Sequence, residues 1–282
     1  MKNLNPYEEN AFAFHKKVIE SKRNSKEDPE YISKVSSYND DIETQYISFE
    51  EKFKVNQLED LSCFGYSDSD KETLLKLYSF KSKIIQHLKV KMTTDEQNRL
   101  INTCQNCTVS EVNSFDHVIP KDEFSEFIVN PKNLFPSCTK CNSYKNTAWR
   151  NDNGRMFLNL YLDTLPNEQY LFVDIKLDEN EIDINYYLEN SNSINSELFD
   201  LIESHYNKLH LFQRFKENSD VVMSELENSI KAFQVLLSLK DIKATIIEEC
   251  EASRRVLGYN YWKIILKLSL IENEDFLKRF EI

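Results

Sequence analysis

Glycine and proline are scarce in this sequence, which has three glycines and six prolines among its 282 residues. Because both residue types interrupt helices, most of the chain can be helical. Three of the six prolines (Pro120, Pro131 and Pro136) fall close together, so irregular structure is expected in that stretch.

Long apolar runs are also absent, and none approaches the length that spans a bilayer. The first residues, Met1 to Glu9, are mostly polar, which is unlike a secretory signal. We therefore expect a cytoplasmic protein, in which a disulfide framework is not favoured.

The six cysteines indicate a metal site instead, because four of them form two Cys-x-x-Cys pairs. Each pair can present two thiolates to one ion, and four thiolates complete the closed tetrahedral shell of a structural zinc. The predicted zinc ligands are Cys104, Cys107, Cys138 and Cys141. The other two, Cys63 and Cys250, are expected to be small buried hydrophobic residues.

Basic residues are outnumbered by acidic ones, 35 to 47, so the formal net charge is −12. Binding to phosphates depends on local clusters of lysine and arginine, however, so their distribution matters more than the sum. Six lysines and one acidic residue lie between Lys71 and Lys91, whereas residues 157–203 hold eleven acidic residues and one lysine. We expect the basic segment, through Lys81, Lys83 and Lys89, to bind nucleic acid. A solvated helix face is the alternative.

The pattern along the chain divides it into four segments: helices and a basic helix in 1–100, the cysteine-rich module in 101–155, a β-hairpin in 156–190, and helices in 191–282. The hairpin is predicted because apolar residues alternate with polar ones from Leu171 to Leu177 and again from Ile182 to Tyr186. Residues 178–181 would form its turn, and the polar stretch 190–196 is a candidate boundary. The expected fold is mainly α with these β elements, an α+β class.

The residues between and after the two cysteine pairs form a further pattern. Asp116 and His117 precede Pro120, the dipeptide Asn133-Leu134 follows, and Cys141 is followed by Asn142 and, three residues later, Lys145. This order resembles the HNH endonuclease family, with its Asp-His-hydrophobic-x-Pro strand, central Asn-Leu and closing Cys-Asn-x-x-Lys. The match covers about 40 residues, and every element stands in the expected order.

The resemblance implies a ββα-metal module that hydrolyses DNA phosphodiesters to 5′-phosphate and 3′-hydroxyl ends. His117 would be the general base, and its ordinary pKa of about 6.5 suits proton abstraction at neutral pH. Asp116 and Asn142 would bind the catalytic ion, and their oxygen ligands suit Mg²⁺ or Mn²⁺. Asn133 would organise the loop that carries the histidine, and Lys145 would meet a phosphate. Because the closing residue is Asn142 and not histidine, softer catalytic metals are disfavoured.

Two other functions fit the same residues. The module could be a catalytically silent zinc unit that binds nucleic acid, or the acidic C-terminal part could dock a protein such as an ATPase. DNA is the expected substrate and RNA the open alternative. Modules of this family on helical flanks suggest a bacterial restriction or anti-phage defence system, by analogy alone. A second nuclease pattern, Asp174-x-Lys176, is better interpreted as the solvent face of the hairpin.

Overall fold

The structure, a computed structural model, describes residues 1–152, 154–177 and 182–280. The chain forms two compact units. The N-terminal unit comprises Asn3–Asn106 and Ser110–Asp163, and the C-terminal unit comprises Met1–Lys2, Cys107–Val109 and Thr164–Ile282. The N-terminal helices thus share a unit with most of the cysteine-rich segment, and the hairpin shares a unit with the C-terminal helices. The candidate boundary at 190–196 lies inside the C-terminal unit.

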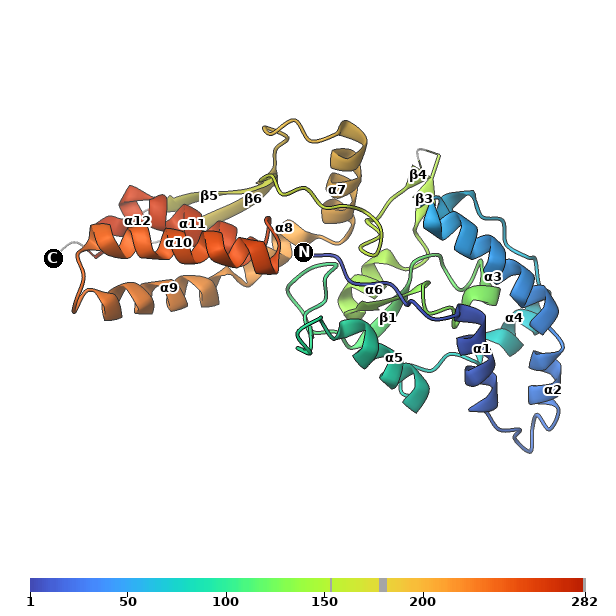
Figure 1. The fold of residues 1–282 in the computed structure, drawn as a ribbon. Coiled ribbons are helices and arrows are strands. Elements are labelled where there is room, and N and C mark those ends of the chain that lie inside the picture. Colours follow the sequence, from blue (N-terminus) through green and yellow to red (C-terminus); the bar gives the residue numbers. More distant parts are fainter. Residues whose placement is uncertain (153, 178–181, 281–282) are drawn as a thin grey trace. The chain divides into compact units, whose positions relative to one another are not determined.

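Helices of the N-terminal unit precede the cysteine-rich segment (Figure 1). They are α1 (Ala11–Glu20), α2 (Tyr31–Ser36), α3 (Asn39–Lys54), the short 3-10 helix η1 (Leu58–Asp60), α4 (Asp68–Leu75) and α5 (Lys83–Thr93). The longest of these, α3, buries one residue in each turn: Ile42, Tyr46, Phe49 and Phe53. This spacing is that of an amphipathic helix packed on a core by one face.

The basic segment is not one helix, which corrects the sequence-based expectation. It is divided into α4 and α5, with Ser82 as the N-cap residue of α5. The side-chain amide of Gln86 donates to the carbonyl of Phe80, and this local bond holds the turn between the helices. Lys81 and Lys83 are exposed, and Lys89 is partly buried. Two other lysines of the segment are engaged in ion pairs, Lys76 with Asp28 and Lys91 with Glu9.

The centre of the cysteine-rich segment is a small antiparallel sheet followed by a helix. Strand β1 (Ser114–His117) pairs with β2 (Leu134–Ser137), so that Asp116 lies opposite Phe135 and His117 opposite Leu134. The connection between them contains the 3-10 helix η2 (Ser125–Phe127), and α6 (Thr139–Lys145) follows β2 and contacts β1 (Figure 1). The short strands β3 (Arg150–Asn151) and β4 (Gly154–Arg155) come next.

The C-terminal unit contains the predicted hairpin. Strands β5 (Leu171–Leu177) and β6 (Ile182–Leu188) are antiparallel, with Leu177 opposite Ile182. Asp174 and Lys176 are exposed, which confirms their place on the solvent face. The proposed turn, residues 178–181, lies outside the described residues.

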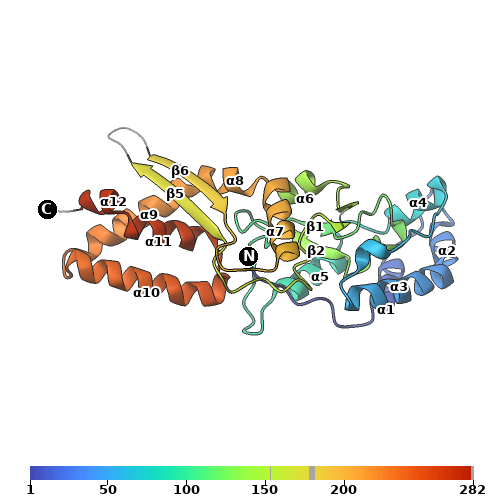
Figure 2. The ribbon, with the colours of Figure 1, turned by 90° about the horizontal axis from the view of Figure 1, so that it is seen from above.

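Helices pack against this hairpin (Figure 2): α11 contacts β5, and α8 contacts β6. The helices of the unit are α7 (Ser196–Lys208), α8 (Leu211–Glu217), α9 (Ser219–Phe233), α10 (Leu239–Leu257), α11 (Trp262–Glu272) and α12 (Glu274–Lys278). On α9 the apolar residues Leu226, Ile230 and Phe233 lie at helical spacing. Leu226 and Ile230 are buried, whereas Phe233 is 42% exposed.

These elements confirm the α+β class at the level of helices with small antiparallel hairpins. Within the described residues, no helix is both long and apolar enough to cross a membrane.

A buried histidine in the N-terminal unit predicts an acid-sensitive fold. His15 is fully buried, stacks on Phe12 and meets the edge of the Tyr46 ring. Burial lowers the pKa of His15 from 6.5 to about 4, opposed by the nearby Asn39 side chain. The unfolded chain therefore binds a proton that the folded chain excludes, so stability is complete above pH 6.5 and falls as the pH drops from 6.5 towards 4.

We expect a loss of about 1.4 kcal/mol per pH unit across that window from this residue. His15→Leu should flatten the dependence, measured as urea unfolding at several pH values. Replacement of the exposed His87 by glutamine is the matched control. Parallel pH dependences for His15→Leu and the parent would contradict the prediction.

Candidate active site

The four paired cysteines form one buried cluster. The sulfur atoms of Cys104, Cys107, Cys138 and Cys141 all lie within 4.8 Å of one another. The Cys104 and Cys141 sulfurs are 3.9 Å apart. A zinc ion with bonds of about 2.3 Å to sulfur separates its ligands by roughly 3.8 Å. The structure thus brings together four thiols that could bind a structural metal ion such as zinc.

Backbone groups turn towards two of these sulfurs. The N–H of Val109 donates to Cys107 Sγ at 3.5 Å, and the N–H of Cys141 donates to Cys138 Sγ at 3.3 Å. Donors of this kind favour thiolate over thiol and so support metal binding. Cys138 is also the N-cap residue of α6, so one side chain both begins the helix and belongs to the cluster. Of the two remaining cysteines, Cys250 is buried as expected, whereas Cys63 is exposed, which corrects that prediction.

Beside the sheet of β1 and β2 lies a cavity of about 480 Å³. Its walls come from the turn before α5, from β1 and the turn after it, and from α6 with the residue that follows. Asp116, His117 and Asn142 all line it. Three residues that the sequence pattern singles out, two from β1 and one from α6, therefore line one cavity.

One ring nitrogen of His117, Nε2, forms a hydrogen bond within the protein. Its Nε2 lies 3.0 Å from the carbonyl oxygen of Ile128. Because a carbonyl can only accept, Nε2 carries the proton of the neutral ring and Nδ1 keeps its lone pair. No described residue is a partner for Nδ1. Burial lowers the pKa of His117 to about 3, well below the ordinary value on which the sequence-based argument rests, so the ring is neutral at pH 7.

Asp116 and Lys145 form a buried ion pair. The Lys145 ammonium lies 3.1 Å from Asp116 Oδ1 and donates to the carbonyl oxygen of His117 at 2.6 Å. Burial raises the pKa of the Asp116 carboxyl, and the Lys145 ammonium opposes that shift. The sequence pattern predicts that Lys145 meets a phosphate. The structure gives it a different environment: Lys145 is 5% exposed because α6 turns it towards β1.

Asn133 joins two parts of the loop that follows His117. It is completely buried, and its Oδ1 accepts the N–H of Ile119 at 2.8 Å. Its Nδ2 donates to the carbonyl oxygens of Ile119, at 3.1 Å, and Phe127, at 3.3 Å. The amide thereby satisfies backbone groups on both sides of the loop. It lies outside the cavity wall and makes no contact there.

Asn142 follows Cys141 on α6, where its Nδ2 donates to the carbonyl oxygen of Phe115 at 3.3 Å. That bond orients the amide so that its oxygen remains for another partner. The predicted catalytic set thus divides into residues that line the cavity (Asp116, His117 and Asn142) and residues that hold them (Asn133 and Lys145).

Comparison with known proteins adds one distant similarity. The chain is 24% identical to Protein ea31 of Escherichia phage lambda over 182 residues, which are 60% of this chain and 61% of that protein. The chain therefore spans about three fifths of the relative that it matches. No family model matches the chain, and no solved structure matches it.

Sequence reasoning misses two features of the cavity. The ring of Tyr78 meets the edge of the His117 ring at a centroid distance of 5.1 Å, although the two residues are far apart in sequence. Lys121 and Asp122 also line the cavity, and their position directly after Pro120 is the signal that could reveal them. Among the residues that the structure describes, Lys81, Lys83 and Lys89 do not line it.

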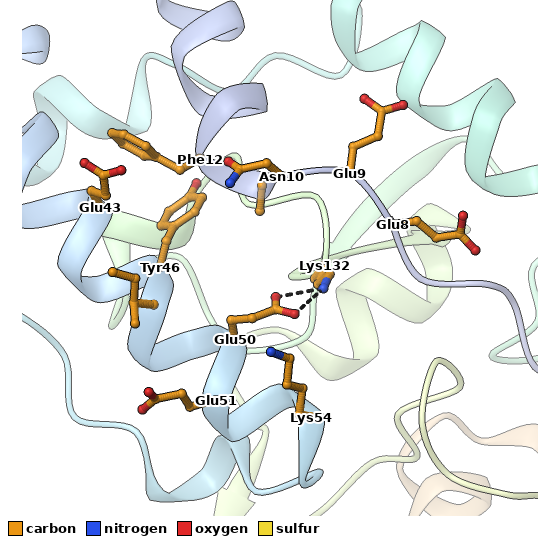
Figure 3. A pocket seen from close by; sticks show the side chains of 12 residues that line it. Glu8, Glu9, Asn10, Phe12, Glu43, Tyr46, Glu50, Glu51, Lys54 and Lys132 are labelled. Atoms are coloured by element: carbon orange, nitrogen blue, oxygen red, sulfur yellow. Dashed lines mark hydrogen bonds and ion pairs between the residues drawn. The ribbon is translucent and has the colours of Figure 1, made fainter.

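A second cavity, of about 410 Å³, lies against α1 and α3 (Figure 3). Five of its lining residues are glutamates: Glu8, Glu9, Glu43, Glu50 and Glu51. The Glu50 carboxylate accepts from the Lys132 ammonium at 2.6 and 2.7 Å. This acidic cavity shares no lining residue with the first one, and its charge does not suit a phosphate.

The cysteine cluster predicts that metal content and folding depend on each other. Protein purified without added metal should contain about one zinc ion per chain, because four thiolates complete its shell. Cys138→Ser removes one thiolate and should lower both the zinc content, by elemental analysis, and the melting temperature. Cys63→Ser, at the exposed cysteine, is the matched control and should change neither. A Cys138→Ser protein that keeps its zinc and its melting temperature would rule out this role.

The buried amide of Asn133 predicts a large effect of a small change. Asn133→Ala leaves the N–H and C=O of Ile119 buried without partners, at a cost of about 1–3 kcal/mol for each unsatisfied group. We expect the free energy of unfolding of the N-terminal unit, measured by denaturant titration, to fall by at least about 2 kcal/mol. Asn102→Ala, at an exposed position of the same unit, should have little effect. Equal unfolding midpoints for the two variants would refute a structural role for Asn133.

Proposed function

We propose that the protein is a divalent-metal-dependent HNH endonuclease that hydrolyses DNA phosphodiesters, with β1, β2 and α6 as its ββα-metal module. The observation that carries the proposal is the shared cavity of Asp116, His117 and Asn142. A carboxylate, a neutral imidazole and an amide at one cavity are the groups that metal-assisted hydrolysis requires.

In this proposal His117 is the general base. The hydrogen bond from Nε2 to the Ile128 carbonyl leaves Nδ1 as the atom that accepts a proton from the attacking water. Burial keeps the ring neutral at pH 7, so Nδ1 carries no proton before the reaction, and the same burial makes the ring a weaker base than the ordinary imidazole on which the sequence-based argument rests. The edge contact with Tyr78 restricts rotation of the ring and keeps Nδ1 in place.

Asp116 and Asn142 are the proposed ligands of Mg²⁺ or Mn²⁺. Lys145 pairs with Oδ1 of Asp116, so Oδ2 is the oxygen offered to an ion, and the Asn142 amide offers its oxygen because Nδ2 is bonded to Phe115. Both donors are hard oxygens, which these cations prefer. When bound, the cation would stabilise the charge on the leaving 3′-oxygen.

Lys145 acts as a positioning residue in this arrangement. Its ammonium holds the Asp116 carboxylate and the His117 carbonyl together, so it connects α6 to the end of β1. It also opposes the rise in the pKa of the Asp116 carboxyl that burial causes. The cysteine cluster, with zinc as its proposed ion, fixes the start of the same helix and hence the position of Asn142.

The proposed substrate is DNA, with products that carry 5′-phosphate and 3′-hydroxyl ends. The exposed Lys81 and Lys83, with the partly buried Lys89, lie on or next to α5 and would bind phosphates outside the cavity. We place the enzyme in the cytoplasm, in a restriction or anti-phage system. Assays of plasmid and RNA with Mg²⁺ or Mn²⁺ distinguish this enzyme from a catalytically silent zinc module. Dependence on a partner such as an ATPase would be seen as cleavage that occurs only when the partner is added.

The division of roles predicts two distinct losses of activity. His117→Ala removes the base but no proposed metal ligand, so plasmid cleavage should fall by on the order of a hundred-fold or more. Asn142→Ala weakens a metal ligand, so its lost cleavage should return in part as the concentration of Mg²⁺ or Mn²⁺ is raised. Zinc content and DNA binding should survive in both.

His87→Ala, at an exposed histidine of α5, is the control and should cut at the parental rate. Melting temperatures measured beside the rates separate lost chemistry from lost folding. A His117→Ala protein that cuts as fast as its parent would show that this cavity is not an active site.

A further inference from the structure

Besides the proposed metal ion, the sequence pattern expects a lysine that meets the substrate phosphate, and Lys145 is not placed to do so. Its ammonium is buried and already donates to Asp116 and to the carbonyl of His117. To reach a phosphate it would have to leave a carboxylate in a buried place, where an unpaired charge is costly. A side-chain contact to the phosphate at this cavity would therefore have to come from another residue.

Lys121 satisfies this need. Of the described residues that line the cavity, it is the single lysine or arginine. Its side chain is exposed, and no hydrogen bond or ion pair engages it within the described part of the chain. An ammonium of this kind remains available to a ligand, whereas Lys76 and Lys91 are already paired.

The backbone around Lys121 is held in place. Asn133 binds the N–H and C=O of Ile119, two residues earlier. The carbonyl of Pro120 then accepts the N–H groups of Glu123, at 3.1 Å, and Phe124, at 2.9 Å. Lys121 thus stands in a closed turn that begins at a proline, and such a turn presents its central side chains to solvent.

The turn also brings the lysine close to the base. Lys121 and His117 both line the cavity, so a phosphate next to Nδ1 would lie in a space that the lysine also borders.

We propose that Lys121 binds a phosphate oxygen of the substrate strand at this cavity, the role that the sequence pattern assigns to Lys145. The inference rests on the proposed function. The ligand is the phosphodiester backbone, so the contact is independent of base sequence. As a compact point charge, lysine can follow the phosphate through the reaction without a fixed two-pronged geometry.

Salt dependence of DNA binding tests the contact without any turnover. A labelled duplex is titrated in Ca²⁺, in place of Mg²⁺, at several salt concentrations. Lys121→Gln should reduce the slope of log K against log salt by about 0.9, the value for one phosphate contact. Lys121→Arg should keep the parental slope. Lys54→Gln, at the exposed lysine of the acidic cavity (Figure 3), makes the same change in net charge and should leave the slope unaltered.

A Lys121→Gln slope equal to that of the parent overturns the inference, as does a parent that does not bind the duplex. Plasmid cleavage with Mn²⁺ separates this result from the fate of the proposed function. If the parent cuts and Lys121→Gln cuts with the same kcat/KM, the nuclease stands and the contact is refuted. If the parent does not cut but the slope changes as expected, the phosphate contact stands and the nuclease is refuted.

Discussion

Four sulfur atoms within 4.8 Å of one another cannot all be charged unless a cation lies among them, because like charges at that distance repel strongly in a buried place. The geometry of the candidate site depends on this constraint. Cys138 begins α6 and Cys141 lies in its first turn, so whatever satisfies the sulfurs also sets the position of the helix. The position of the helix in turn determines that Asn142 lines the cavity and that Lys145 points towards β1. The cysteine cluster at one end of a short helix thereby influences the positions of side chains along that helix.

The polar groups of the site differ in how they offset the cost of burial. Asn133 is neutral and forms three hydrogen bonds to backbone groups, so it holds the loop without bringing a charge inside. Asp116 and Lys145 bring two charges, which compensate each other. His117 stays neutral because burial disfavours its charged form. These three sets of polar groups are therefore held by contacts within the protein, which is the condition for electrostatic stabilisation without later rearrangement.

Local patterns in the sequence predict the elements of this fold better than the directions of its side chains. The alternation around Val173 and Ile184 is enough to predict the hairpin, because a strand with one buried face leaves that trace. The spacing of the cysteines likewise predicts one cluster. Lys145 is different: its place in the pattern is clear, but only the packing of α6 on β1 determines that its ammonium points inward. The break between α4 and α5 escapes prediction too, since it involves a side-chain bond from Gln86 to the Phe80 carbonyl that the residue pattern does not reveal.

The bond between His117 Nε2 and the Ile128 carbonyl has a consequence for the proposed role of this histidine as a base. The Nε2 side of the imidazole is bonded to the Ile128 carbonyl, which does not pass a proton on, so a proton gained at Nδ1 has no exit through the protein interior. It can leave only by the side from which it came, through the cavity and into bulk water. A histidine held in this way can exchange a proton only at Nδ1. In the proposed reaction, proton release and departure of the cut strand would then share one route through the cavity.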